Sequence, residues 1–519
     1  MPPKTYDITI TFRSASNLPV ADLGTLASDP YVAAILTTAV SIQDPEKSPP
    51  LHFRTPTVRT TTNPAWECRW DLGNVPREGT KLRIDVLDED VRNRDDRLGQ
   101  AVIDFQELEN WGSNQVNEGS YKLRKKGASK KAAVLKLCVA DMKKKKKVTT
   151  MIVVRIEIKR ETRLAEGFHD IKRAFTCGPN YWSKHFSPLI GKVVRAKDSP
   201  QEEDKATNFS FEANKLQLTG PVPPELHHRY VDFAPFVTAY FSGKGLKGRV
   251  LNQALHSQYN HLYCYDQNTE YGYIDNSPDG RKEDSNALAR RFLEMTHWSE
   301  GYRIFTYVIT LDAEWRFTET GDEFAVDLLS KHSLHSDVSK YIAYSGEFFV
   351  RKRHSHHEHH KAHGNDANHH DGEAAHGADV ITSPNGESKH TDHHPSHYEL
   401  IIDNDSGTYR PKEELLPKLK SFLESNLHGI GAVTTYHCFD KKLEELKKER
   451  KDAKHKEDGH RIFRQRSMSS NGSSISSGDE QELDTGKEGN IFKRQWSKWM
   501  MNGSTSPAAP AGQGGGASR

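Results

Sequence analysis

Five aspartates, placed just off the ends of runs that alternate like β-strands, are the residues most able to do chemistry. Asp22 and Asp29 stand in one turn, and Asp88, Asp90 and Asp96 stand in a later one. Carboxylates gathered at one end of a small β-domain repel one another unless a hard cation neutralises them. Ca²⁺ accepts about six to eight oxygens in irregular shells, whereas Mg²⁺ needs stricter geometry and Zn²⁺ prefers His or Cys, which these turns lack. The pattern therefore favours a calcium site.

The elements that must position these turns read as all β from residue 5 to residue 141. Alternation with a period of two predicts strands separated by Pro, Gly, Asn and Asp clusters at the spacing of a β-sandwich. With a short strand at 52–57 the number is eight, the others lying at 6–12, 30–36, 66–71, 80–87, 98–104, 119–124 and 132–140.

Four short stretches of this segment follow one family pattern. They are the Leu18-Pro19 start of the first turn, Ser28 to Val32 at a strand entry, Thr62 to Trp66 before a strand, and the spaced Asp88, Asp90, Asp96 and Gly99. In this combination the segment resembles the C2 domain of calcium-dependent membrane-binding proteins. The resemblance implies an eight-stranded sandwich in which calcium bridges the loop carboxylates and anionic lipid phosphates. Because the first strand leads directly into loop 1, the order looks like the type II topology.

Loop 1 departs from the family pattern. It carries six residues between Asp22 and Asp29, one more than the commonest spacing, so Asp22 is open to displacement from the ion. The alternative is a C2 sandwich that packs but no longer binds calcium, with its aspartates capping turns.

Apolar and basic residues near the loop tips are the candidates for membrane contact. Leu23 and Leu26 in loop 1 suit shallow insertion, and Arg92 and Arg94 in loop 3 would face anionic headgroups at about 1 kcal/mol each. A basic block follows the last expected strand and either adds such contacts or is a solvated linker. This block consists of Lys143, Lys144, Lys145, Lys146 and Lys147.

The C-terminal tail holds a second candidate contact. On a helix Trp496 and Trp499 would share one apolar face within a short basic segment, which suits either a bilayer interface or a docking peptide for a protein partner. Ser467, Ser476 and Ser477 lie in patterns that kinases favour, although such short patterns also arise by chance. Added phosphate would oppose binding of the tail to anionic lipid.

The composition predicts a multidomain chain. After the C2 domain (5–141) we expect a polybasic linker (142–148), a mixed α/β domain (149–440), and a charged helix with a disordered Ser/Gly-rich tail (441–519). The α/β domain is expected to contain a disordered insertion at 354–397, which holds 13 of the 27 histidines.

Only 35% of the residues are hydrophobic, the mean hydropathy is −0.78, and the net charge of +2 indicates no nucleic-acid partner. No apolar run approaches the ~20 residues that cross a bilayer, the start has no secretory pattern, and the five cysteines form no CxxC pair. We therefore expect a cytoplasmic protein that associates reversibly with membranes as a peripheral protein.

Two functions follow from these features. The first is an adaptor or scaffold that binds anionic phospholipid when calcium rises. The alternative is an enzyme that acts on a lipid or lipid-derived substrate through the second domain. Short segments such as Ser345 to Phe349 and Arg316 to Gly321 look similar to C2-carrying proteins of filamentous fungi. This similarity indicates a relationship but assigns no reaction. The polar residues available there form no recognisable catalytic set: Asp312, Glu314, His332, His335 and Asp337.

Overall fold

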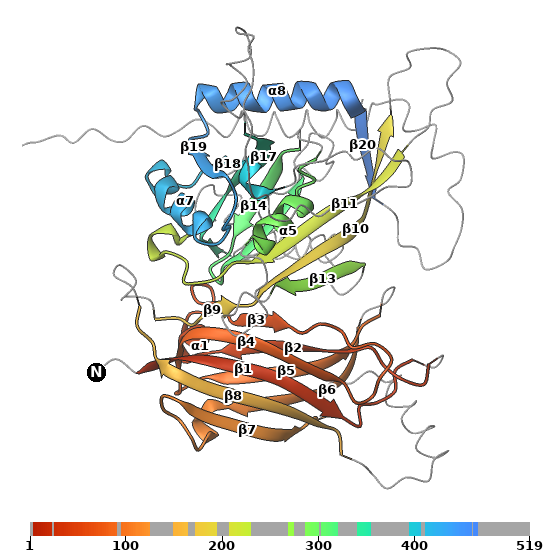
Figure 1. Cartoon of the computed structure of the whole chain (residues 1–519), viewed down its shortest axis with the longest axis vertical. Coiled ribbons are helices and arrows are strands. Elements are labelled where there is room, and N and C mark those ends of the chain that lie inside the picture. Colours follow the sequence, from red (N-terminus) through yellow and green to blue (C-terminus); the bar gives the residue numbers. More distant parts are fainter. Residues whose placement is uncertain are drawn as a thin grey trace, which may run out of the picture. The chain divides into compact units, whose positions relative to one another are not determined.

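The computed structural model of the chain is shown in Figure 1. It describes residues 4–22, 25–90, 95–124, 149–164, 172–194, 207–229, 268–274, 286–299, 303–319, 340–353, 394–405, 410–458 and 460–465. The strand expected at 132–140 lies outside these ranges.

Two sheets of the N-terminal region form a β-sandwich (Figure 1). One sheet has the order β3-β2-β5-β6, and the other has the order β7-β8-β1-β4-β9. The strands are β1 (Thr5–Ser16), β2 (Pro30–Thr37), β3 (Leu51–Arg54), β4 (Ala65–Pro76), β5 (Lys81–Asp88), β6 (Asp96–Asp104), β7 (Gln115–Lys122), β8 (Met151–Glu161) and β9 (Phe175–Gly178).

The core between these sheets follows from the alternation read in the sequence. Ile8, Ile10 and Phe12 of β1 point to one side and are at most 1% exposed. Phe53 of β3 stacks on Trp70 of β4 with ring centroids 5.2 Å apart, which joins the two sheets. Burial of such aromatic side chains supplies much of the stability of a small sandwich.

The strand at the start of the expected second domain lies instead in the sandwich. In β8 the alternate residues Ile152, Val154, Ile156 and Ile158 are all fully buried, because the strand pairs along its length with both β1 and β7. The sandwich therefore extends beyond residue 141. With β8 beside it, β1 leads straight into loop 1, the strand order expected of the type II topology.

The second region contains a large mixed sheet. Its order is β13-β10-β11-β15-β14-β17-β18-β19, and β20 pairs with β10. All of its described pairings are antiparallel except that of β18 with β19. The strands are β10 (Asn180–Val194), β11 (Thr207–Gln217), β13 (Thr269–Ile274), β14 (Phe305–Ile309), β15 (Glu314–Glu319), β17 (Tyr344–Lys352), β18 (Tyr398–Asp403), β19 (Ala432–Tyr436) and β20 (His460–Gln465). A separate two-stranded pair joins β12 (His228–Arg229) to β16 (Tyr341–Ile342).

Helices α5 (Ala287–Met295) and α7 (Leu416–Glu424) cover one face of this sheet. Both helices place apolar residues three or four positions apart, and Phe292 and Leu419 are fully buried in one cluster with the sheet residues. Since α7 connects β18 to β19, it serves as the crossover that a parallel strand pair requires.

Helix α8 (Lys441–Asp458) contributes Leu443 to a second cluster with Phe349 and Ile401. These two sheet residues alternate with neighbours that face the first cluster, so α8 lies on the opposite face. The helix is strongly polar, and no helix in the described ranges is both long enough and apolar enough to cross a membrane.

Ion pairs hold α8 on the sheet. The ammonium of Lys447 lies 2.7 Å from Glu347 and 2.6 Å from Asp403, and all three side chains are at most 16% exposed. One turn further, the guanidinium of Arg450 donates to the carbonyl of Val350 at 2.8 Å. Such buried carboxylates depend on their cation, because an unpaired buried charge is costly.

Five other short helices lie in the described ranges, namely α1 (Ala39–Gln43), η1 (Phe105–Glu107), η2 (Pro224–Leu226), η5 (Pro395–His397) and η6 (Glu413–Leu415). The 3₁₀ helix η5 falls within the last residues of the expected His-rich insertion, and Pro395 is buried there. Pro395 to His397 are therefore helical rather than part of a disordered insertion, and residues 354–393 lie outside the described ranges.

Replacing Lys447 by Ala is expected to destabilise the second region by about 3–5 kcal/mol, since Glu347 and Asp403 lose their shared cation. Hydrogen exchange of the full chain should then show less protection in peptides from β17 and β18, with the β1 and β4 peptides unchanged. Lys448→Ala, which removes an exposed lysine of the same helix, is the matched control. Equal protection in the two variants would contradict a role for the buried pairs.

Candidate metal centre

Strand pairing brings the two aspartate-bearing loops to the same end of the sandwich. In the register of β2 with β5, Pro30 is opposite Asp88, and in that of β5 with β6, Asp88 is opposite Asp96. Asp29 precedes Pro30 directly, so three of the five predicted aspartates lie side by side across neighbouring strands.

Three carboxylates form a compact group. Asp22, Asp88 and Asp90 each offer an oxygen that lies within 4.8 Å of the other two. The longer loop 1 does not remove Asp22 from the group. The backbone N–H of Asp22 donates to the carbonyl of Ala27 at 3.1 Å, which closes the base of the loop and leaves the extra length beyond it.

Asp88 is the carboxylate of the group whose ionisation is least favourable. Its side chain is 1% exposed. Burial raises the pKa of Asp88 to about 7, against the hydrogen bond that it accepts from the backbone N–H of Asp29, and the charges of Asp22, Asp90 and Asp29 raise it further. Burial, with repulsion from Asp29 and Asp96, also raises the pKa of Asp22. The group therefore holds its negative charge at a cost near neutral pH.

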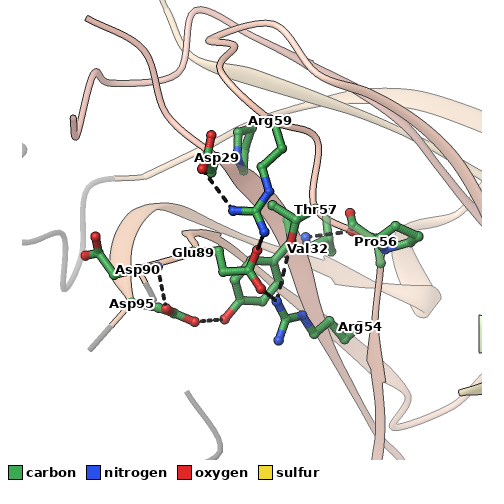
Figure 2. Close-up of polar contacts among 12 residues, drawn as sticks. Asp29, Val32, Arg54, Pro56, Thr57, Arg59, Glu89, Asp90 and Asp95 are labelled. Atoms are coloured by element: carbon green, nitrogen blue, oxygen red, sulfur yellow. Dashed lines mark hydrogen bonds and ion pairs between the residues drawn. The ribbon is translucent and has the colours of Figure 1, made fainter. Parts of the chain in front are cut away.

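Asp29 is turned away from the group, toward the loop between β3 and β4, which we call loop 2 (residues 55–64). One carboxylate oxygen accepts from the backbone N–H of Thr60 at 2.7 Å, and the other lies 2.9 Å from the guanidinium of Arg59 (Figure 2). Asp96 is also outside the compact group, although its charge still acts on Asp22.

A polar network that the sequence analysis did not identify borders the group (Figure 2). Arg59 also pairs with Glu89 at 2.6 Å, and Glu89 in turn pairs with Arg54 at 3.0 Å. Arg54 lies 3.8 Å from the centre of the Tyr31 ring. The sequence contained a weak indication of this network. Arg59 is a cation in a turn, and that turn lies beside a strand end that carries several anions.

Asp95 also joins the network, at the far end of the loop between β5 and β6 (loop 3), of which residues 91–94 lie outside the described ranges. The hydroxyl of Tyr31 donates to Asp95 at 2.5 Å. The other oxygen of Asp95 accepts from the backbone N–H of Asp90 at 2.9 Å. Asp95 therefore links Tyr31 to the backbone of Asp90. The sequence analysis did not assign this role to Asp95, because it lies between the predicted ligands Asp90 and Asp96.

The donor set fits a calcium ion. All three grouped side chains offer hard carboxylate oxygens, and two further carboxylates stand next to them. Neither His nor Cys belongs to the group, which argues against zinc. A divalent cation would offset the burial and repulsion that raise the pKa of Asp88.

Of the residues expected to contact a membrane, only Leu26 lies in the described part of the chain. It is 59% exposed and has a backbone φ of +52°. The other membrane-contact candidates lie outside the described residues: Leu23, Arg92, Arg94, Lys143, Lys144, Lys145, Lys146, Lys147, Trp496 and Trp499. The phosphorylation candidates Ser467, Ser476 and Ser477 also lie outside them.

The polar candidates of the second region fall into two groups. His332, His335 and Asp337 lie outside the described residues, Asp312 lies in the turn between β14 and β15, and Glu314 is the first residue of β15. Burial alone would raise the pKa of Glu314. The positive charges of Arg316 and Lys215 outweigh this effect and lower the pKa to about 2. Arg316 lies 2.5 Å from this carboxylate, so Glu314 is a structural ion-pair partner with little capacity to accept a proton.

Residues 6–123 match the C2 domain family. Together with the sandwich and the carboxylate-bearing loops, this match identifies the N-terminal segment as a C2 domain. Tricalbin-1 of Saccharomyces cerevisiae is 30% identical over 111 residues, which cover 21% of this chain and 8% of the length of Tricalbin-1.

Solved structures with some similarity include a C2 domain of plant Extended Synaptotagmin 1, at 17% identity and a TM-score of 0.23, covering 31% of this chain and 98% of that one. Human GIVD cytosolic phospholipase A2 is 13% identical with a TM-score of 0.23, covering 50% of this chain and 37% of that one.

Calcium binding by the full chain should depend on pH through Asp88. Because its folded-state pKa is raised above the unfolded value, the native state gains from the bound proton, and its calcium-free stability should fall as pH rises from about 4 to about 7. Calcium must displace that proton. The dissociation constant for calcium should therefore rise by up to about tenfold for each pH unit below 7. Calorimetry in buffers of different ionisation enthalpy would detect the released protons.

Asp88→Asn should remove the fall in calcium-free stability that Asp88 contributes between about pH 4 and about pH 7, as thermal unfolding in chelator would show. Glu109→Gln, at an exposed carboxylate beyond the opposite end of β6, should retain it. A calcium affinity that stays constant between about pH 5 and about pH 7 would contradict the assignment of Asp88 to the site.

Proposed function

We propose that this chain is a calcium-dependent, phospholipid-binding peripheral membrane protein. The observation that supports this most strongly is the compact group of Asp22, Asp88 and Asp90 at the loop end of a C2 sandwich. A buried Asp88 held beside two partly exposed carboxylates has a cost in the calcium-free state, and a site of that kind gives calcium a large effect on local charge.

The number of ligands supports a role for lipid. A calcium ion takes about six to eight oxygens, and three grouped carboxylates supply only part of that shell. Asp29 and Asp96 stand close enough to influence the charge of Asp22 and can add oxygens. Phosphate oxygens of an anionic lipid would complete the shell, so the ion would bridge the loops to the headgroup.

Leu26 gives loop 1 an apolar tip next to this site. A bulky residue with a positive φ occupies an unfavourable region of backbone space, and exposure of its side chain loses the benefit of burial. Insertion of this side chain into the acyl boundary would recover that benefit while the bound ion holds the headgroups.

The rest of the chain fits an adaptor or scaffold role within this proposal. The Lys143–Lys147 block and the Trp496–Trp499 island would add membrane or protein contacts, and phosphates at Ser467, Ser476 or Ser477 would weaken contact with anionic lipid. Reversible peripheral association from the cytoplasm follows from this arrangement. The enzyme alternative receives no support from Glu314, which its neighbouring cations hold as a carboxylate.

The full chain should sediment with vesicles of phosphatidylcholine and phosphatidylserine in calcium but not in chelator. The full chain is needed, since a fragment that ended before Met151 would lack β8. Asp22→Asn and Asp90→Asn should each require at least about tenfold more calcium, because each removes one ligand and one charge. Equal sedimentation in calcium and chelator, or none in either, would refute the proposal. Glu109→Gln should behave like the parent chain.

Leu26→Asn tests the apolar contact separately from the ion. Asn tolerates a positive φ, so this change removes the apolar side chain while it preserves the loop backbone. We expect several-fold weaker vesicle binding at saturating calcium, with calcium affinity in the absence of lipid unchanged. Unchanged vesicle binding would mean that Leu26 stays in water.

A further inference from the structure

Arg59 is a cation that the protein itself supplies to the acidic end of the sandwich. Its guanidinium lies 2.9 Å from Asp29 and 2.6 Å from Glu89, and the side chain is 56% exposed (Figure 2). Asp29 in turn donates its backbone N–H to a carboxylate oxygen of Asp88 at 2.5 Å. The Arg59 charge is therefore one residue away from the grouped carboxylates.

Both oxygens of Asp29 are engaged by loop 2. Arg59 holds one, and the backbone N–H of Thr60 holds the other at 2.7 Å. These contacts account for the absence of Asp29 from the compact group that Asp22, Asp88 and Asp90 form. The backbone of Asp29 therefore contacts the grouped carboxylates, while its side chain pairs with Arg59, a cation of the same chain.

The conformation of loop 2 is strained where it contacts Asp29. Thr60 has a φ of +54°, a region that β-branched residues rarely occupy. This conformation directs the Thr60 N–H at the Asp29 carboxylate. Strain of this kind persists only where surrounding contacts maintain it, and it is released when those contacts are lost.

Arg59 would keep a partner after it leaves Asp29. Glu89 is 17% exposed, and its two oxygens pair separately with Arg59 and with Arg54. The ion pair with Glu89 can therefore persist while Asp29 turns toward a bound ion. The structure shows Asp29 paired with Arg59, and a turn of its side chain toward the carboxylate group would give a second arrangement.

We propose that Arg59 is a tethered counter-cation that competes with calcium for Asp29 and so sets the calcium concentration at which the C2 domain responds. The inference rests on the proposed function, because it concerns the same ion. Calcium binding exchanges one cation for another: the Asp29 carboxylate leaves the guanidinium and Thr60, joins the ion, and Arg59 remains on Glu89. Arginine stays protonated throughout, so the exchange requires no proton transfer.

Arg59→Gln tests this competition. Titration of the full chain with calcium alone, followed by calorimetry, should show about tenfold tighter binding, since a nearby positive charge is lost and Asp29 is released. Thermal unfolding should change in opposite directions: a lower midpoint than the parent chain in chelator and an equal or higher midpoint in saturating calcium. A purely structural ion pair would lower the midpoint in both conditions.

Two further variants keep the test selective. Arg160→Gln removes a cation that pairs with Asp7 at the opposite end of β1, and it should leave calcium affinity unchanged. Thr60→Asn relieves the strain of loop 2 and should stabilise the calcium-free arrangement, so it should bind calcium a few-fold more weakly.

The outcomes separate the inference from the function on which it rests. Tighter binding by Arg59→Gln together with weaker binding by Thr60→Asn supports the competition. Equal or weaker binding by Arg59→Gln, with the parent chain still binding calcium and vesicles, refutes the competition and leaves the proposed function intact. A parent chain that binds calcium neither alone nor with phosphatidylserine vesicles refutes both.

Discussion

The burial of Asp88 among neighbouring carboxylates sets the electrostatics of the loop end of the sandwich. The loops at one end of the sandwich hold oxygens of Asp22, Asp88 and Asp90 within 4.8 Å of one another, and Asp88 is almost wholly buried. The cost is visible in the raised pKa of Asp88, which brings its titration to neutral pH. Because the ionised carboxylates are unfavourable without a cation, binding of a cation would change the stability of the site strongly.

The two regions of the chain meet the same constraint in different ways. In the second region, Glu347 and Asp403 receive their cation permanently from Lys447, so the charges serve to attach α8 to the sheet. In the C2 domain, Arg59 pairs with Asp29 and Glu89, while the pKa of Asp88 in the central group stays raised. The pairing of Lys447 is structural, whereas the proposed role of Arg59 depends on the incomplete pairing of the central group.

The organisation of the sandwich links this site to distant parts of the chain. The strand β7 ends at Lys122 and β8 begins only at Met151, yet β8 pairs with both β7 and β1. Because β1 carries loop 1, the position of Asp22 depends on a strand that sequence analysis assigned to the second domain. A register error in β8 would turn its four buried residues to solvent and disturb that support.

The class of the first domain, most of its strands and the acidic loops could be predicted from the amino-acid sequence, because alternation and turn chemistry are local properties. The mixed α/β character of the second region and the charged helix α8 were also predicted. The three-dimensional structure was needed to show that Asp22 joins Asp88 and Asp90, that Asp29 pairs with Arg59, and that β8 completes the sandwich. Those outcomes depend on contacts between residues 30 or more positions apart, as with Arg59 and Asp29. Local patterns do not encode such contacts, since the register and packing of several strands set them together.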